Sequence, residues 1–381
     1  MPKYKFTEIA INSTEKKKPT EADKDTYIGL EHLDSGTLTV SRWGSEVAPI
    51  GEKLLMKKGD VLFGKRRAYQ KKVGIAPFDG IFSAHGMVLR PREDVITKEY
   101  FPLFISSDYF LNEAIRISVG SLSPTVNWKD LKELEFYIPS IEEQRRITPL
   151  VWAAIETKNA YKNLIARTDE LVKSQFIEMF GDFKTNPKNL PIVPISSLFE
   201  VGSSKRVFQK DWLSEGIPFY RAREIVKLAE QGYVDNDLFI SQAMYDEYSQ
   251  KYGAPVPGDI MVTGVGTLGI CYLVREGDRF YYKDGNTLCF HNRGAINSRF
   301  VLECYKMPFV REQIDAKAGG TTVGTYTIDT ANKTLIFNPP RAQQDEFVAF
   351  VEQSDKSKFE LQEAIVRIDN LIKSLIQQET E

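Results

Sequence analysis

The chain contains an internal repeat in which equivalent positions lie 200 residues apart, so that Gln144 aligns with Gln344 without a gap. The identical pairs are Pro139/Pro339, Gln144/Gln344, Val151/Val351, Lys158/Lys358, Ile165/Ile365, Arg167/Arg367, Asp169/Asp369, Leu171/Leu371, Lys173/Lys373 and Ser174/Ser374. Ten identities in forty positions exceed the roughly two or three expected from average residue usage. Solenoid repeats are about 20 to 50 residues long, so this single, longer repetition indicates a duplicated unit with pseudo-twofold symmetry.

Each repeat ends in a long amphipathic helix. The first is expected to begin near Ile141, capped by Ser140, because apolar residues recur every three or four positions from there. Roughly 36 residues at about 1.5 Å each give a rod near 54 Å, which one small globule cannot cover. We therefore expect the two helices to pack on each other as an antiparallel coiled coil. The alternative is that each helix packs on its own globule.

Pro149 complicates the first helix. A proline inside a helix removes a backbone hydrogen bond and predicts a kink in the first two turns. The regular part of this helix is then expected to start after Pro149.

Short β segments punctuated by turns precede each helix, and one helix is expected among them around residues 98–118. Gly258–Val262 stands in the second half where Gly59–Phe63 stands in the first. The sequence therefore predicts an α+β fold with two pseudo-twofold-related domains separated by two long helices. The expected segments are 1–140 (first domain), 141–181 (central spacer helix), 182–340 (second domain) and 341–381 (C-terminal spacer helix).

A net charge of −2 and a pI near 6.1 argue against a protein that binds nucleic acid through a broad positive field. Basic residues do gather locally, for example at Lys65-Arg66-Arg67. No stretch approaches the roughly 18 apolar residues of a membrane helix, and the N-terminal segment has no apolar run typical of a signal peptide. We expect a cytoplasmic protein.

The cysteines and histidines show no metal-binding spacing. Cys271, Cys289 and Cys304 form an odd set in one half of the chain, and the three histidines are scattered singly. Reduced, buried thiols are the better interpretation. We expect no metal site in this chain.

Two motifs resemble parts of enzymes but lack the required context. Gly264–Gly269 matches GxGxxG, yet the following Ile270–Val274 predicts a strand, so a Gly-rich turn between two strands is favoured over a dinucleotide site. Asn338–Arg341 resembles the Asn-Pro-Pro-aromatic tetrad of DNA amino-methyltransferases, but Arg341 replaces the aromatic residue that would stack on a flipped base. We interpret it as a strand-to-helix turn, and no other catalytic set stands out.

Motifs at both ends of the first helix, and two segments of the first globule, carry a family resemblance. They are Ile138–Ile147, Ser174–Asp182, Gly59–Gly64 and Ile75–Gly80. Together they resemble the specificity subunit of type I restriction-modification systems, and the resemblance covers essentially the entire chain. One departure is Arg341–Gln344, which lacks the paired acids found at Glu142–Glu143 in the first helix.

The resemblance implies a non-catalytic, sequence-specific DNA-binding subunit. Its two target-recognition domains would each read one half of a bipartite target in double-stranded DNA, with the helices as the spacer. The implied partners are two modification (methyltransferase) subunits and restriction subunits. S-adenosylmethionine and ATP would bind to those partners, and no cofactor would bind to this chain.

Two other interpretations remain from the residues. A non-nucleic-acid scaffold or adaptor could use the coiled coil to join protein partners, and the acidic pI favours it. An adenine methyltransferase is weaker, because its tetrad is broken.

We expect the DNA contacts to come from polar loops of both globules. Arg and Asn can each bind a base edge through two hydrogen bonds, and Lys and hydroxyl groups suit phosphates. The candidates in the first globule are Lys65, Arg66, Arg67, Tyr69, Lys71, Ser121, Ser123, Thr125 and Asn127. Those in the second are Lys205, Arg206, Arg221, Arg223, Thr263, Thr267, Thr321, Thr322 and Tyr326.

Overall fold

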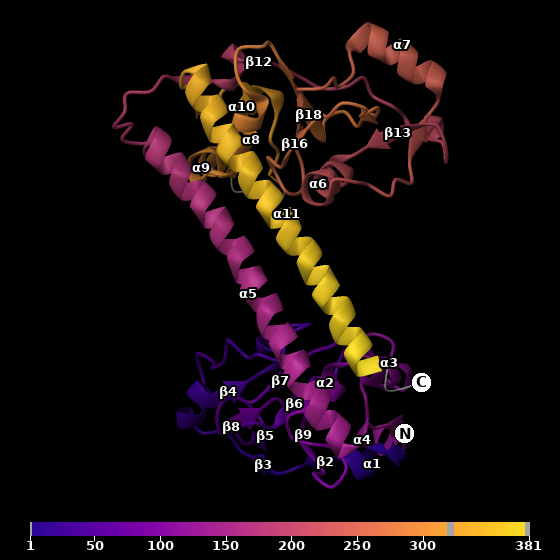
Figure 1. The fold of residues 1–381 in the computed structure, drawn as a ribbon. Coiled ribbons are helices and arrows are strands. Elements are labelled where there is room, and N and C mark those ends of the chain that lie inside the picture. Colours follow the sequence, from indigo (N-terminus) through magenta and orange to yellow (C-terminus); the bar gives the residue numbers. More distant parts are fainter. Residues whose placement is uncertain (1, 318–323, 378–381) are drawn as a thin grey trace. The chain divides into compact units, whose positions relative to one another are not determined.

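The computed structural model describes residues 2–317 and 324–377, which form two compact units (Figure 1). Unit 1 contains the described residues up to Asn163 and from Leu361 onward, and unit 2 is Leu164–Glu360. Each unit therefore combines one globule with the adjoining parts of both long helices. Within the described residues, no helix combines the length and the apolar character that crossing a membrane requires.

Unit 1 begins with short strands and ends its globule with a group of helices. Its strands are β1 (Lys3–Lys5), β2 (Ala10–Ser13), β3 (Lys16–Lys17), β4 (Tyr27–Ile28), β5 (Lys53–Met56), β6 (Val61–Phe63), β7 (Val73–Ile75), β8 (Gly80–Phe82), β9 (Met87–Pro91) and β10 (Glu135–Tyr137). Its helices are α1 (Phe6–Ile9), α2 (Phe101–Ser106), α3 (Asp108–Arg116) and α4 (Trp128–Leu131), followed by the long α5 (Ile141–Phe180), which continues into unit 2.

Unit 2 repeats this order with two inserted helices. Its strands are β11 (Ile192–Pro194), β12 (Phe199–Gly202), β13 (Ile217–Tyr220), β14 (Phe239–Ile240), β15 (Ile260–Thr263), β16 (Cys271–Leu273), β17 (Tyr281–Tyr282), β18 (Thr287–Asn292) and β19 (Leu335–Phe337). Its helices are α6 (Ala222–Gln231), α7 (Gln242–Tyr252), α8 (Ser298–Lys306), α9 (Pro308–Lys317) and α10 (Ile328–Asn332), followed by α11 (Arg341–Gln377).

The main sheet has the same antiparallel strand order in both units. The order is β2-β9-β6-β7 in unit 1 and β12-β18-β15-β16 in unit 2. An antiparallel pair, β1 with β10 or β11 with β19, leads into each long helix. The second sheets differ, with order β3-β5-β8-β4 in one unit and β14-β13-β17 in the other. The duplication predicted from the sequence is therefore closest around the main sheet and the helices.

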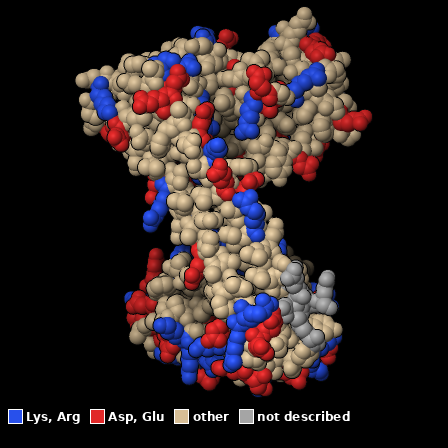
Figure 2. Space-filling view, in the orientation of Figure 1, with Lys and Arg blue, Asp and Glu red and all other residues tan. Residues whose placement is uncertain are grey.

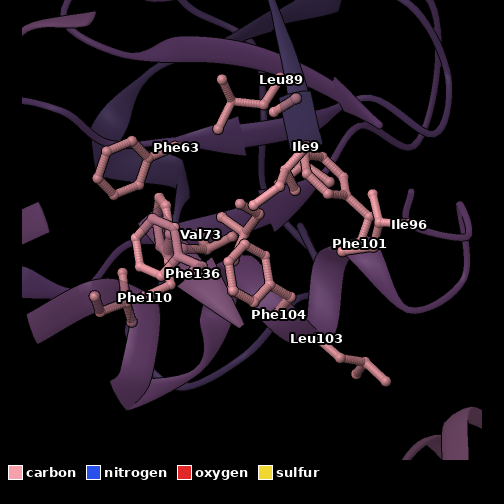
Figure 3. Close-up of a cluster of buried hydrophobic side chains, with 14 of the residues drawn as sticks. Ile9, Phe63, Val73, Leu89, Ile96, Phe101, Leu103, Phe104, Phe110 and Phe136 are labelled. Carbon is pink, nitrogen blue, oxygen red and sulfur yellow. The ribbon is translucent and has the colours of Figure 1, made fainter. Parts of the chain in front are cut away.

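Each unit has its own hydrophobic core. In unit 1 the core joins the main sheet to α2 and α3 through a group of phenylalanines (Figure 3). Phe104, Phe110 and Phe136 lie with ring centroids 5.3 to 5.6 Å apart. Ile147 and Val151 of α5 belong to the same buried cluster, so the start of the long helix is part of this core. Burial of these side chains removes apolar area from water, worth about 25 cal/mol per Å².

The two long helices contact each other within both units. In unit 1 the early part of α5 lies beside the last part of α11, and Lys158 is 2.5 Å from Asp369. In unit 2 the late part of α5 lies beside the early part of α11, and Lys358 is 2.8 Å from Asp169. These ion pairs join equivalent residues of the two repeats, and the helices are antiparallel. The predicted helix-on-helix packing is confirmed.

Gln144 and Gln344 make the same hydrogen bonds in the two units, which explains why this position is identical in both repeats. Gln144 is 0% exposed, accepts a hydrogen bond from the Thr97 amide at 2.7 Å and donates to the Pro139 carbonyl at 2.8 Å. Gln344 is 1% exposed and makes the same contacts with Asn297 and Pro339, both at 2.8 Å. Each glutamine satisfies buried backbone groups where a helix leaves its globule, since unpaired groups there cost about 1 to 3 kcal/mol.

Two helix expectations require correction. The single helix expected around 98–118 is two helices, α2 and α3, separated at Ser107. Ser107 has extended backbone angles, and its hydroxyl accepts a hydrogen bond from the Phe110 amide, so it starts a new helix. The regular part of the first long helix does not start after Pro149, because α5 runs unbroken from Ile141. Ser140 accepts a hydrogen bond from the Glu143 amide, as a cap should.

Candidate nucleic-acid interface

Two of the predicted loops in unit 1 are held together by backbone hydrogen bonds. The loop between β6 and β7 carries Lys65, Arg66 and Arg67. The Arg67 amide donates to the Pro124 carbonyl at 2.7 Å, and the Val126 amide donates to the Lys65 carbonyl at 2.9 Å. The loop with Ser121, Ser123, Thr125 and Asn127 therefore lies beside the basic loop, although about 60 residues separate them in the sequence.

The basic loop has an unusual backbone. Arg67 and Lys71 both have left-handed conformations, with φ of 55° and 50°, on either side of a short 3-10 turn at Ala68–Gln70. Residues other than glycine adopt this conformation rarely, and such strain is often found at functional sites. Hydrogen bonds from the amides of Gln70 and Lys71 to the turn hold it in place.

Five basic side chains meet at this surface, and we refer to Lys16, Lys53, Lys65, Arg66 and His85 as the basic cluster. Arg66 Nε donates to Ser123 Oγ at 3.0 Å, and its Nη1 lies 3.5 Å from His85 Nε2. Burial lowers the pKa of Lys65, and Lys16 lowers it further. Burial also lowers the pKa of His85, with added repulsion from Arg66, Lys65 and Lys53.

The basic cluster is poorly neutralised. Among the described residues, Lys65 and Arg66 make no ion pair with a carboxylate, and the one ion pair of Lys16, with Glu52, is long at 3.5 Å. Lys53 donates to the carbonyls of Ile50 and Gly51. The unpaired cations of this cluster, Lys53, Lys65 and Arg66, suit an anionic ligand.

The other predicted residues of unit 1 fall into different environments. Arg67, Tyr69, Ser121 and Asn127 are exposed. Thr125 is half-buried, and its hydroxyl donates to the Ser123 carbonyl at 3.0 Å. Lys71 is bound instead to Asp108 at 2.7 Å, beside α3.

The predicted arginines of unit 2 are neutralised by carboxylates. Arg206 pairs with Asp284 at 2.8 Å, while Arg221 and Arg223 share Glu224 and Asp237. Burial alone would raise the pKa of Glu224, but hydrogen bonds from both arginines leave it below its ordinary value. Arg221 and Glu224 also lie at the start of α6. These contacts stabilise the fold of unit 2 and leave less charge for a ligand.

Lys205, the remaining basic candidate of unit 2, contacts aromatic side chains. The Lys205 ammonium lies 5.4 Å from the ring centroid of Tyr252, and the Lys205 amide donates to the Tyr281 hydroxyl at 3.0 Å. Lys205 is exposed, so its ammonium can face a ligand.

The Gly-rich loop of unit 2 occupies the position of the basic loop of unit 1. It connects β15 to β16, which confirms the predicted turn between two strands. The Tyr326 amide donates to the Gly264 carbonyl at 2.9 Å, as Val126 does to Lys65 in unit 1. Thr263 and Tyr326 are buried, at 0% and 2% exposed, and support the loop, whereas Thr267 is exposed.

Two further candidates, Thr321 and Thr322, lie outside the described residues. The Asn338–Arg341 segment connects β19 to α11, which confirms the predicted strand-to-helix turn.

One cluster of unit 2 was not foreseen from spacing. Asp259, Cys289 and His291 place one ligand atom each within 4.8 Å of one another, which is close enough to share a metal ion. Asp259, however, already accepts hydrogen bonds from the Val256 and Asn292 amides and lies 2.8 Å from His291 Nδ1. Cys289 and His291 lie two positions apart on β18 and therefore on the same face of the strand, which the sequence shows, whereas Asp259 is brought to them only by the fold. We assign the cluster a structural role, because Asp60 and Arg90 make the equivalent contact in unit 1.

Charge is mixed over the face of both units drawn in Figure 2, where Lys and Arg side chains alternate with Asp and Glu. This agrees with the net charge of −2. An anionic partner therefore has to be recognised by local groups such as the basic cluster.

Comparison with known proteins shows similarity mainly over the first part of the chain. Residues 6–160 match the family model of the type I restriction modification DNA specificity domain. A specificity subunit of a type I restriction enzyme from Haemophilus influenzae is 27% identical over 163 residues, which is 42% of this chain and 39% of that protein. One from Escherichia coli is 25% identical over 182 residues (46% and 40%), and one from Methanocaldococcus jannaschii is 26% identical over 281 residues (69% and 63%). The chain therefore spans less than two thirds of the length of these relatives.

Solved structures share the fold over nearly the whole chain. A chain from a study of complex assembly in a type I restriction-modification system has a TM-score of 0.59 and 18% identity, covering 100% of this chain and 97% of that one. The type I S subunit from M. genitalium has a TM-score of 0.56 and 15% identity, covering 98% and 95%. The chain is therefore similar in sequence to type I restriction enzyme specificity subunits, chiefly over residues 6–160, and similar in fold to the solved structures over nearly its whole length.

Proposed function

We propose that this chain reads a bipartite target in double-stranded DNA and directs modification and restriction subunits to it. The observation that carries the proposal is the duplication, because the same sheet and the same glutamine contacts occur in both units. Each unit then reads one half-site. The predicted segments 1–140, 141–181, 182–340 and 341–381 are the two target-recognition domains and the two spacer helices of this proposal.

The chemistry of the reaction lies with the partners in this proposal. Two modification subunits bind S-adenosylmethionine and transfer its methyl group to adenine, and restriction subunits use ATP. The two α5–α11 contact regions are related by the repeat, which supports one modification subunit for each. The expected cytoplasmic location follows from the same assignment, since the target is genomic DNA.

The two units contribute differently to binding. The basic cluster of unit 1 has cations free for phosphates and base edges, whereas the arginines of unit 2 are held by Glu224, Asp237 and Asp284. An arginine that binds guanine through two hydrogen bonds contributes about 1 to 3 kcal/mol of discrimination. Arg66 is the strongest candidate, because Ser123 and His85 already hold its guanidinium in place.

The test compares Arg66→Gln with Arg223→Gln in the assembled modification complex. Arg66→Gln is expected to weaken binding to the mapped target by about 1 to 3 kcal/mol, with little change on unrelated DNA. Arg223→Gln is the matched control, because its exposed guanidinium is engaged by Glu224 and Asp237, and it should retain wild-type affinity. Quantitative binding to labelled duplexes at fixed salt measures both.

Equal affinities of the wild type and Arg66→Gln for the target DNA would show that this loop is not part of the DNA interface. A complex without DNA affinity would instead favour the scaffold interpretation.

A further inference from the structure

Two aliphatic side chains of unit 1 are almost completely exposed. Ile50 is 94% exposed and Leu122 is 92% exposed, and each lies on a loop of the globule. Leaving a whole aliphatic side chain in water forgoes about 1.5 to 3 kcal/mol of burial free energy. A single exposed aliphatic residue is ordinary, but these two adjoin the same functional surface.

Leu122 lies beside Arg66. It immediately precedes Ser123, whose hydroxyl accepts the hydrogen bond from Arg66 Nε at 3.0 Å. Its loop is closed by a reciprocal pair of backbone hydrogen bonds between Val119 and Thr125, at 3.0 and 2.9 Å. Leu122 is therefore presented on a loop that is already ordered, which lowers the entropy lost when it contacts a ligand.

Ile50 lies beside Lys53 of the basic cluster. The Lys53 ammonium donates to the Ile50 carbonyl and to the Gly51 carbonyl, the latter at 3.2 Å. The same ammonium is close enough to His85 to contribute to the lowering of its pKa, after burial and the repulsion from Arg66 and Lys65. The two apolar side chains therefore each lie beside a cation of the basic cluster, Lys53 or Arg66, that makes no ion pair with a carboxylate among the described residues.

The chemistry of DNA limits what such side chains can contact. Phosphates and sugars around a basic cluster are polar, and the major-groove edges of the bases carry one apolar group, the C5-methyl of thymine. We propose that Leu122 and Ile50 contact thymine methyl groups in the half-site read by unit 1. This inference rests on the proposed function, and it makes the two side chains specificity-determining residues beside Arg66.

The charge around them favours DNA over a protein partner. A protein interface of this kind would bring the cations of the basic cluster close to a second apolar surface, and burying unpaired cations is costly. A phosphate backbone neutralises them while the aliphatic side chains reach the base edges.

The experiment replaces each thymine of the mapped half-site with deoxyuridine, one at a time, which removes the methyl group and keeps the base pair. Binding of the assembled wild-type complex should weaken about threefold to tenfold at one or two positions. Leu122→Ser and Ile50→Ser should weaken binding to thymine DNA by a similar factor and should each lose the discrimination at one of these positions. Val256→Ser, which changes a 54% exposed side chain in unit 2, is the control and should retain it.

Several results would overturn the inference. They are a unit 1 half-site without thymine, a wild-type complex that ignores every deoxyuridine, and serine variants that still discriminate. Failure of Leu122→Ser to assemble with the other subunits would place this side chain in a protein interface instead. Absence of DNA binding by the wild-type complex is a separate outcome that would refute the proposed function itself.

Discussion

A buried aspartate precedes an equivalent strand in both units, but its partner differs. Asp60 accepts two hydrogen bonds from Arg90, at 2.8 and 2.9 Å, whereas Asp259 lies 2.8 Å from His291 Nδ1. The hydrogen bond to Asp259 raises the pKa of His291, against the opposing effect of burial. Arginine keeps its charge at every physiological pH, while histidine loses it near neutrality. The same structural contact is therefore sensitive to pH in unit 2 alone.

His291→Arg should remove this sensitivity. Because the folded-state pKa of His291 is raised above about 6.5, its stabilising effect is complete below that pH and is lost as the pH rises through the folded-state value. The wild-type chain should therefore unfold at lower temperature on going from about pH 6 to pH 8, and His291→Arg should show a smaller decrease. Thermal denaturation at a series of pH values measures the difference.

Arg90→His is the reciprocal control. It should introduce a decrease of the same sign in unit 1, because it places a titrating group against Asp60. Identical pH profiles for the wild type and His291→Arg would show that this pair does not contribute to the pH dependence.

The candidate site was predictable in part from residue types. Lys65–Arg67 stood out because basic residues cluster there, and loop 121–127 because hydroxyl residues cluster there. The structure brings the two loops together. Lys16, Lys53 and His85 were missed. Lys53 and His85 are isolated in the sequence, and although Lys16 begins the run Lys16–Lys18, it is distant from Lys65 and joins the basic cluster only through the fold. The pairing of Arg221 with Glu224 was readable, because the two residues lie three positions apart at a helix start.

At the scale of elements, helix ends followed their capping signals. Ser140 marked the start of α5 correctly, and the same signal at Ser107-Asp108 was overlooked within the expected helix at 98–118. The second sheets could not be foreseen, because they are formed by strands of two to four residues whose pairing depends on distant segments. The local sequence pattern therefore predicts the long helices well, but it predicts the short strands poorly.

Pro149 and its repeat counterpart Ala349 provide a matched test of helix stability. Both are exposed positions inside long helices. Proline in a helix interior costs about 3 kcal/mol relative to alanine, because it lacks the amide hydrogen and its ring collides with the preceding turn. Pro149→Ala should raise the free energy of unfolding by up to that amount, and Ala349→Pro should lower it by about as much. Urea denaturation measures both.

If Pro149→Ala lowers the free energy of unfolding, the contacts of the proline ring with its surroundings stabilise the chain by more than its low helix propensity costs. If Ala349→Pro has no effect, the start of α11 contributes little to the cooperative unit.

At the scale of the whole molecule, one chain contains two copies of a globule and a helix. Lys158 binds Asp369 and Lys358 binds Asp169, so each helix supplies the same two residues to equivalent ion pairs. Ion pairs with exposed members contribute little stability, about 0 to 1 kcal/mol, so their recurrence is better explained by register than by energy. In the proposed function this register sets the length of helix between the two reading units, and with it the unread gap of the target.

The most direct measurement is a map of methylated adenines in cells that carry a lengthened spacer. Seven residues, about two helical turns, are inserted in the stretch Lys158–Val172 of α5 and in the matching stretch 358–372 of α11. They add about 10 Å, or about three base pairs. The account predicts the same two half-sites with a correspondingly longer gap between them. An unchanged gap, with methylation retained, would contradict the claim that the paired helices set the spacing.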